Sequence, residues 1–222
     1  MDIDLKKKYA VITGDFIGFS DLPASVRREM YFVLKSCGRD LAEAFPGIMP
    51  YEVDVFRGDG WQMLITPPAL SLRSALYVRA FVKAHAPERE VDARLAIGIG
   101  PIDYVPDGRV SAGDGIAFRL SGKLLDRMSS PKAGSMRFAA SGGDEEALLD
   151  GLVRMTGAFA DGWTARQSLA VTGALREWPR NKIAGLWTDP ISPRAVGKHL
   201  ERANWHAVDD GLTAFEGALA ES

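Results

Sequence analysis

Patterns typical of β-strands and of α-helices alternate along roughly the first 140 residues, and no strand pattern recurs after that point. The order is strand, helix, two short strands, helix, strand, helix and strand. This order predicts an α+β fold of the split βαβ type, in which an antiparallel or mixed sheet carries its helices on one face. We therefore expect a sheet domain over residues 1–142 and an all-helical domain over residues 143–222.

Local periodicity sets the expected bounds of each segment. Residues 9–13 read Tyr-Ala-Val-Ile-Thr, an apolar and β-branched run that is typical of a buried strand. Two short apolar runs on either side of residues 57–60 predict a hairpin. The order up to residue 100 corresponds to a ferredoxin-like βαββαβ sheet. We expect helices over residues 23–45, 68–85, 114–128 and 145–159, and further strands at residues 53–55, 63–65, 94–100 and 136–140.

Composition excludes several classes of function. The chain carries 27 Lys and Arg against 29 Asp and Glu, so it is not basic enough to bind nucleic acid over its whole surface, although a local basic patch is compatible with that total. Cys37 is the only cysteine, and the three histidines lack the spacing of a zinc site. No apolar run reaches the length of about 18 residues that a membrane span requires. We expect a cytoplasmic protein with no membrane partner.

Two aspartates are expected at the same edge of the sheet. Asp15 ends the first predicted strand and Asp59 opens the third. In a split βαβ sheet these strands are antiparallel neighbours, so the end of one lies beside the start of the other. Two adjacent carboxylates repel unless a cation lies between them, and hard oxygen ligands suit Mg²⁺ or Mn²⁺. Asp15 and Asp59 are therefore candidate metal ligands; the alternative is that Asp and Gly are simply frequent in turns.

Four segments of the sheet domain resemble motifs of the class III nucleotide cyclases. Residues 14–20 (Gly-Asp-Phe-Ile-Gly-Phe-Ser) resemble the first metal-binding motif, and residues 56–59 (Phe-Arg-Gly-Asp) resemble the second. Residues 94–100 are similar to the family's Arg-Ile-Gly-Ile-His strand. Residues 108–119 resemble the segment that carries its base-binding and transition-state residues. The resemblance extends over residues 8–130.

This resemblance implies a nucleotide ligand and a divalent cofactor, Mg²⁺ or Mn²⁺. It implies that Asp15 and Asp59 bind the metal ion. It also implies that the triphosphate contacts the residues of the first turn and one glycine of the hairpin, namely Phe16, Ile17, Gly18, Phe19, Ser20 and Gly58.

The chain departs from the cyclase pattern at positions that carry the chemistry. Val55 stands where the family has a base-selecting Lys, and Ala117 and Ser121 stand where it has the transition-state Asn and Arg. Loss of one group that stabilises developing phosphate charge costs on the order of 10²–10³ in rate, so these losses argue against an active cyclase. No catalytic residue is assigned for this reason. The same pattern also resembles the small SatD family of cyclase-like proteins.

Two helix patterns in the C-terminal domain are joined by a short turn. Residues 181–187 form the first and residues 192–200 the second, with Ser192 as the predicted N-cap. The pair resembles the helix-turn-helix of bacterial transcription regulators, which implies duplex DNA as a partner. The alternative is a tri-helical packing module with a charged, solvated face. The candidate DNA-binding residues are Ser192, Arg194, Lys198 and His199.

These observations support one main hypothesis and two alternatives. The main hypothesis is a cytoplasmic regulatory protein, in which a degenerate cyclase-like domain senses a metal ion and a nucleotide and is coupled to a DNA-binding helix-turn-helix. The first alternative is a divalent-metal-dependent nucleotidyl cyclase or other nucleotide-processing enzyme. The second is a structural module in which both halves mediate protein contacts. The resemblance to both families further implies a homodimer.

Overall fold

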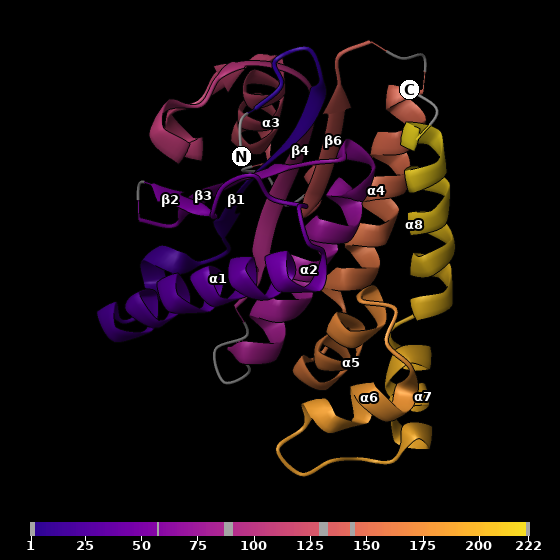
Figure 1. Cartoon of the computed structure of the whole chain (residues 1–222). Coiled ribbons are helices and arrows are strands. Elements are labelled where there is room, and N and C mark those ends of the chain that lie inside the picture. The colour runs from indigo at the N-terminus through magenta and orange to yellow at the C-terminus, as the bar shows by residue number, and fades with distance from the viewer. Residues whose placement is uncertain (1–2, 57, 87–90, 129–132, 143–144, 221–222) are drawn as a thin grey trace.

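The computed structural model shows an α+β protein and describes residues 3–56, 58–86, 91–128, 133–142 and 145–220. Its strands are β1 (Lys8–Phe16), β2 (Asp54–Phe56), β3 (Gly60–Ile65), β4 (Ala93–Tyr104), β5 (Asp114–Gly115) and β6 (Met136–Ala140). Its α-helices are α1 (Ala24–Ala44), α2 (Ser71–His85), α3 (Ile116–Arg127), α4 (Glu146–Asp161), α5 (Ala165–Leu175), α6 (Arg180–Ile183), α7 (Pro193–Arg202) and α8 (Trp205–Ala220). These elements follow the order expected from the sequence (Figure 1), except that residues 114–115, expected to begin a helix, form the short strand β5 before α3.

β1 lies in the middle of the sheet. The strand order is β2-β3-β1-β4-β5, and β6 also pairs with β4. β1 is antiparallel to both β3 and β4, whereas β6 is parallel to β4, so the sheet is mixed. The register pairs Gly14 with Trp61, so the end of β1 adjoins the start of β3. The expected adjacency of the first and third strands is therefore confirmed.

Helices cover both faces of the sheet. Side chains along β1 alternate between the faces. Ala10 and Ile12 join the core beneath α1 and α2, whereas Val11 joins a second cluster with residues of α3. The expectation that all helices lie on one face is wrong for α3. Gly98 of β4 allows α3 to approach closely, since a Cβ atom there would lie 2.3 Å from the carbonyl oxygen of Ala117.

The C-terminal helices pack against the sheet half of the molecule. α4 packs on β6, α5 packs on α2, and α8 contacts α4. One hydrophobic core runs through both halves and includes Leu76 of α2 together with Ala170 and Val171 of α5. The boundary expected near residue 142 falls between β6 and α4, and this core is continuous across it.

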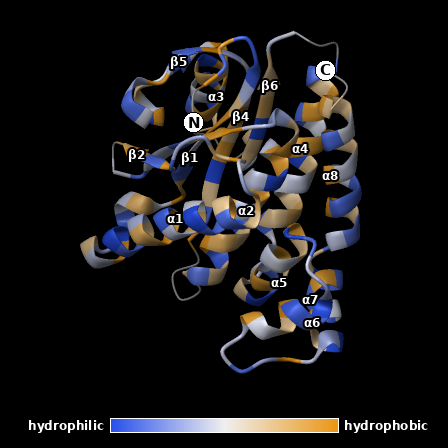
Figure 2. Ribbon diagram, in the orientation of Figure 1, coloured by the Kyte–Doolittle hydropathy of each residue, from blue (hydrophilic) through white to orange (hydrophobic). Residues whose placement is uncertain are grey.

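Most helices show one buried and one exposed side. In Figure 2 they carry bands of apolar and polar residues, as expected of helices that cover a core on one side. α2 differs, because α5 covers its outer side and every residue from Ser71 to Val82 is buried. Among the residues that the structure describes, no helix combines the length and the apolar character that crossing a membrane requires.

Candidate functional site

Asp15 lies near the end of β1 and forms a two-point ion pair with Arg94. The guanidinium donates from Nε to Oδ1 at 2.9 Å and from Nη2 to Oδ2 at 2.6 Å. The two residues face each other across β1 and β4, and Arg94 Nη1 also donates to the carbonyl oxygen of Met128 at 3.0 Å. These contacts fix the orientation of the Asp15 carboxylate, whose side chain is 20% exposed.

Asp59 lies in the turn that leads into β3, at the same edge of the sheet as Asp15. It is partly exposed and makes no ion pair or hydrogen bond within the part of the chain that the structure describes. Each Asp15 oxygen keeps a lone pair beyond the one that accepts from Arg94. Carboxylate oxygens are suitable ligands for Mg²⁺ or Mn²⁺, which proteins often bind through one or two carboxylates and the phosphates of a ligand. Among the described residues no group of three or more Asp, Glu, His or Cys gathers, so the other ligands would be phosphate and water oxygens.

The turn after β1 presents backbone amide groups. Gly18 is exposed and has a φ of 68°, a conformation that glycine adopts without strain. The amides of Gly18, Phe19 and Ser20 donate to no acceptor within the described residues, whereas Ile17 donates to a backbone carbonyl. Consecutive unpaired amides suit an anionic group such as a phosphate. Phe16 is buried and stacks on Phe19 at 5.7 Å, so its side chain packs the turn against the core.

The positions that align with the cyclase transition-state residues are closed to solvent. Ala117 and Ser121 lie on the side of α3 that packs on the sheet, and both are fully buried. The hydroxyl of Ser121 lies 2.8 Å from Oγ1 of Thr13, which in turn accepts a hydrogen bond from Gln62 at 3.0 Å. Neither position therefore offers a side chain to a ligand in solvent. Val55 is half-buried in β2 and carries no hydrogen-bonding side chain.

The C-terminal candidate site consists of α6, a turn and α7. α6 continues as a 3₁₀ turn over Ala184–Leu186, and α7 begins after Ser192, whose hydroxyl accepts a hydrogen bond from the amide of Ala195 at 3.2 Å. Ser192 is therefore the N-cap that the sequence predicts. Ile183 and Val196 are buried where the two helices meet. Both helices lie beyond α5, at the end of the molecule away from the strands (Figure 1).

The outer side of α7 carries unpaired basic side chains. Arg194 and Lys198 are exposed, and neither makes a hydrogen bond or ion pair with any described residue. His199 is half-buried and stacks on Trp187, with 5.6 Å between the ring centroids. Burial lowers the pKa of His199, and two nearby arginines lower it further. The imidazole is therefore neutral at neutral pH and adds no charge to this face.

Arg180 joins this basic face, and the sequence pattern alone did not single it out. Its guanidinium lies over Gly197 of α7, where a Cβ atom would be 3.1 Å from Nη1 and 3.4 Å from Cζ. Gly197 lies three residues after Arg194 and Lys198 lies four residues after it, so both positions adjoin Arg194 on the same side of the helix. The only sequence feature that points to this position of Arg180 is a glycine on the polar side of α7. The contact between that glycine and an arginine of α6 depends on how the two helices pack.

Arg176 links the C-terminal helices to the sheet half. Its Nη2 atom pairs with the carboxylate of Asp40 on α1 and bonds to the hydroxyl of Tyr77 on α2. The guanidinium carbon lies 4.5 Å from the ring centroid of Trp178, and Nζ of Lys182 on α6 lies 3.7 Å from the centroid of the same side chain. A chain of contacts therefore runs from α1, through the corner after α5, to α6.

Comparison with known proteins leaves the family open. No family model matches the chain, and no curated protein matches it. Among solved structures it is similar to one described as a bacterial light-regulated adenylyl cyclase, with a TM-score of 0.35 and 18% sequence identity. The match spans 59% of this chain and 42% of that chain, less than half of the cyclase structure. The assignment of function therefore depends on the sites described above.

Proposed function

We propose that the chain is a cytoplasmic regulatory protein whose sheet half binds a nucleoside triphosphate with Mg²⁺ or Mn²⁺ and whose helical half binds duplex DNA. Asp15 and Asp59 hold the metal ion, and the unpaired amides of Gly18, Phe19 and Ser20 contact the phosphates together with Gly58. Phe16 and Ile17 belong to the same turn and hold it against the rest of the fold. The metal ion supplies positive charge against the triphosphate. We further propose that the protein acts as a homodimer, because helix-turn-helix proteins commonly bind two half-sites with two copies.

The observation that carries the DNA-binding part is the basic face formed by Arg180, Arg194 and Lys198. Two of these cations have no partner within the described residues, and all three lie on or over an exposed helix at one end of the molecule. Such a face suits the phosphate backbone beside a major groove. The whole chain has a net charge of −2, so attraction to DNA has to come from this local face. Ser192 and the neutral His199 add hydrogen-bonding groups at its rim.

The nucleotide-binding part is supported by the edge of the sheet at which β1 ends and β3 begins. Two carboxylates and three unpaired amides lie in the segments that border this edge. The carboxylates suit a divalent cation and the amides suit a phosphate, so a metal-bound triphosphate satisfies both groups with one ligand.

A second candidate function is a divalent-metal-dependent nucleotidyl cyclase or other nucleotide-processing enzyme. The pair of carboxylates favours it, because metal-assisted phosphoryl chemistry uses such pairs. The burial of Ala117 and Ser121 opposes the cyclase form, since the positions aligned with the transition-state residues present nothing to a bound nucleotide. Sensing without turnover is the better-supported function.

The contacts of Arg176 support a coupling between the two activities. The turn proposed to contact phosphate leads into α1, and α1 carries Asp40, which pairs with Arg176 just before α6. α6 in turn packs on α7. In this proposal α1 has two arrangements that differ in their affinity for the nucleotide, so nucleotide binding favours one of them. The resulting shift of α1 then displaces α6 and α7 through the contact with Arg176.

The test is a titration of the full chain against a pool of random-sequence duplexes, with and without MnCl₂ and a non-hydrolysable nucleoside triphosphate analogue. We expect binding that weakens steeply as salt rises, because phosphate contacts release counterions. The analogue with Mn²⁺ should change the affinity, and Asp15→Ala should remove that change. Absence of binding at about 50 mM salt would refute the DNA-binding part. Binding that the analogue leaves unchanged would refute the sensing part.

A further inference from the structure

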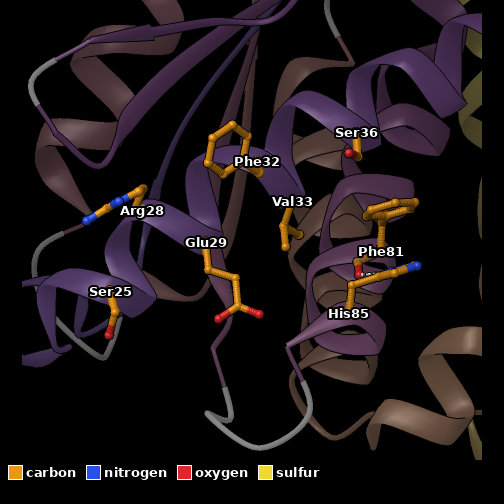
Figure 3. A pocket seen from close by; sticks show the side chains of 8 residues that line it. All are labelled: Ser25, Arg28, Glu29, Phe32, Val33, Ser36, Phe81 and His85. Atoms are coloured by element: carbon orange, nitrogen blue, oxygen red, sulfur yellow. Dashed lines mark hydrogen bonds between the residues drawn. The ribbon is translucent and has the colours of Figure 1, made fainter.

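The outer side of α1 forms a wall of a groove that neither candidate site uses. The groove encloses about 570 Å³ between α1 and the end of α2 (Figure 3). Six of its lining residues come from α1, at positions 25, 28, 29, 32, 33 and 36. This set recurs once per helical turn and therefore lies on one face of that helix. Phe81 and His85 of α2 line the other side.

Phe32 gives this face an exposed aromatic surface. The exposed fraction is 60% for Phe32 and 43% for Tyr31 beside it. The two rings meet edge to face with 5.6 Å between their centroids, so one turn of α1 presents a continuous aromatic area. In Figure 3 the Phe32 ring extends away from Phe81 and His85. Exposed apolar area of this kind is typical of a protein interface.

Arg28 and Glu29 lie in the same face, and neither has a partner within the described residues. They are neighbours in sequence, and neighbouring positions on a helix do not face each other, so they point in different directions (Figure 3). A molecule that covers this face has to offer an acidic group to Arg28 and a basic group to Glu29. A second copy of the same face offers both, because in a two-fold interface each contact occurs twice with the roles exchanged.

We propose that α1 is the surface through which two copies of this chain associate, with the two helices antiparallel and crossing between Arg28 and Glu29. Arg28 of each copy then pairs with the partner's Glu29, which gives two ion pairs related by the two-fold axis. Phe32 lies opposite the partner's Ser25, whose small side chain leaves room for the ring. The aromatic rings supply the apolar contact, and the charges set the register. This inference rests on the proposed function only for the expectation of a dimer.

The test is the dissociation constant of the dimer, measured by sedimentation velocity on the full chain without DNA, nucleotide or metal. Phe32→Glu should raise that constant about tenfold or more, a loss of about 1.4 kcal/mol of association. Arg28→Glu should raise it as well, because it sets like charges against each other at two places. Adding Glu29→Arg to Arg28→Glu exchanges the two signs and should restore association.

The matched control is Met155→Glu on α4, which replaces another exposed apolar side chain, 64% exposed, far from this groove in sequence. It should leave the dissociation constant unchanged, and the melting temperature of each variant checks that it folds. A chain that stays monomeric from micromolar to near-millimolar concentration overturns the proposal. So does a dimer that resists Phe32→Glu, or one that the paired charge exchange fails to restore. A monomeric chain would also remove the homodimer from the proposed function, whereas a dimer that resists Phe32→Glu refutes this surface alone. DNA and nucleotide binding are not used in these measurements and are tested separately.

Discussion

The guanidinium of Arg176 pairs with the carboxylate of Asp40, and this contact fastens the corner after α5 to α1. The hydroxyl of Tyr77 lies against both groups and bonds to each of them. The side chain of Arg176 is 12% exposed and that of Asp40 is 30% exposed, so water screens the pair only in part. Removing one member of such a pair leaves the other charge without its partner, which is the costly way to break it.

Arg176→Met should therefore destabilise the protein by about 3 kcal/mol, the low end for a buried pair because Asp40 is partly exposed. The double variant with Asp40→Asn should cost less than the two single substitutions together, since the pair is removed as a unit. Chemical unfolding of the four proteins of this cycle measures the coupling. Additive free energies of unfolding would contradict a direct interaction.

A second prediction concerns catalysis. Purified protein with Mn²⁺ and ATP or GTP should form little or no cyclic nucleotide, because Ala117 and Ser121 are buried against the sheet. Chromatography of the reaction products measures this. Turnover of about 1 s⁻¹ or more that is lost in Asp15→Ala would establish the enzyme alternative instead. Asp54→Ala is the matched control, since that carboxylate accepts hydrogen bonds from Ser111 and belongs to β2.

The order of the helices and of the longer strands follows from the sequence because each segment carries its own periodicity, whereas the two residues of β5 are too few to show one. The strand expected at residues 136–140 has the bounds of β6, and the helix expected over residues 23–45 differs from α1 by one residue at each end. The face of the sheet that α3 covers could not be predicted in this way. The periodicity of a helix shows which of its own sides is buried, but it does not show which face of the sheet that side contacts. The close approach of α3 to β4 is marked only by Gly98.

The candidate sites likewise contain features that the sequence predicts and features that depend on tertiary packing. The position of Asp15 and Asp59 at one edge of the sheet follows from strand order, and the N-cap role of Ser192 follows from local sequence. The ion pair of Asp15 with Arg94 depends on the register between β1 and β4, which the sequence pattern does not specify. The position of Arg180 over α7 depends on helix packing, so no local pattern contains it.

A third prediction concerns Gly14, which precedes Asp15. The indole of Trp61 lies across it, and a Cβ atom there would be 2.3 Å from Cζ2 of the ring. Gly14→Ala should therefore force a fully buried tryptophan to move and destabilise the protein by about 1–3 kcal/mol. Gly122→Ala on α3 is the matched control, because a Cβ atom there meets nothing within 4 Å. Ala is the better helix former, so this control should gain up to about 1 kcal/mol. A similar loss in both variants by chemical unfolding would contradict the steric argument.

A fourth prediction follows from the buried ion-pair network around Arg79. This arginine is fully buried and bonds to Asp92 and Asp161, and Lys83 also pairs with Asp92 at 3.1 Å. Burial by itself would raise the pKa of Asp92. The charge and hydrogen bonds of Arg79, together with Lys83 and the amide of Ala93, outweigh burial and hold this pKa below its ordinary value. A carboxyl group of this kind stabilises the folded state above its unfolded pKa, and that contribution is lost as the pH falls through the folded pKa.

The free energy of unfolding should therefore decline as the pH drops below about 4, the ordinary pKa of Asp. Asp92→Asn should lower stability at neutral pH and make the decline shallower, because the substituted side chain takes up no proton. Denaturant unfolding at a series of pH values measures both slopes. Parallel slopes for the two proteins would show that Asp92 does not contribute to the acid dependence.

A fifth prediction concerns DNA binding by α7. Arg194→Ala and Lys198→Ala should each weaken the binding of duplex DNA and leave the melting temperature nearly unchanged, because both side chains are exposed and unpaired within the described residues. Each lost phosphate contact should reduce the slope of log affinity against log salt by about 0.9. Anisotropy titrations of the full chain at several salt concentrations measure this. Arg154→Ala on α4 removes an exposed charge elsewhere and should change neither quantity.

Gly197→Ala separates the placement of Arg180 from its charge. The new Cβ atom would lie 3.1 Å from Nη1 of Arg180, so the guanidinium has to shift by a few tenths of an ångström while the net charge of the protein stays the same. We expect weaker DNA binding than in the unmodified chain, in the same direction as Arg180→Ala and smaller. The substitution should not lower the melting temperature, because the atoms that yield are the far end of a flexible side chain and Ala favours the helix. If Gly197→Ala binds DNA as tightly as the unmodified chain while Arg180→Ala binds weakly, the charge of Arg180 contributes to binding and a small shift of its guanidinium over α7 does not affect it.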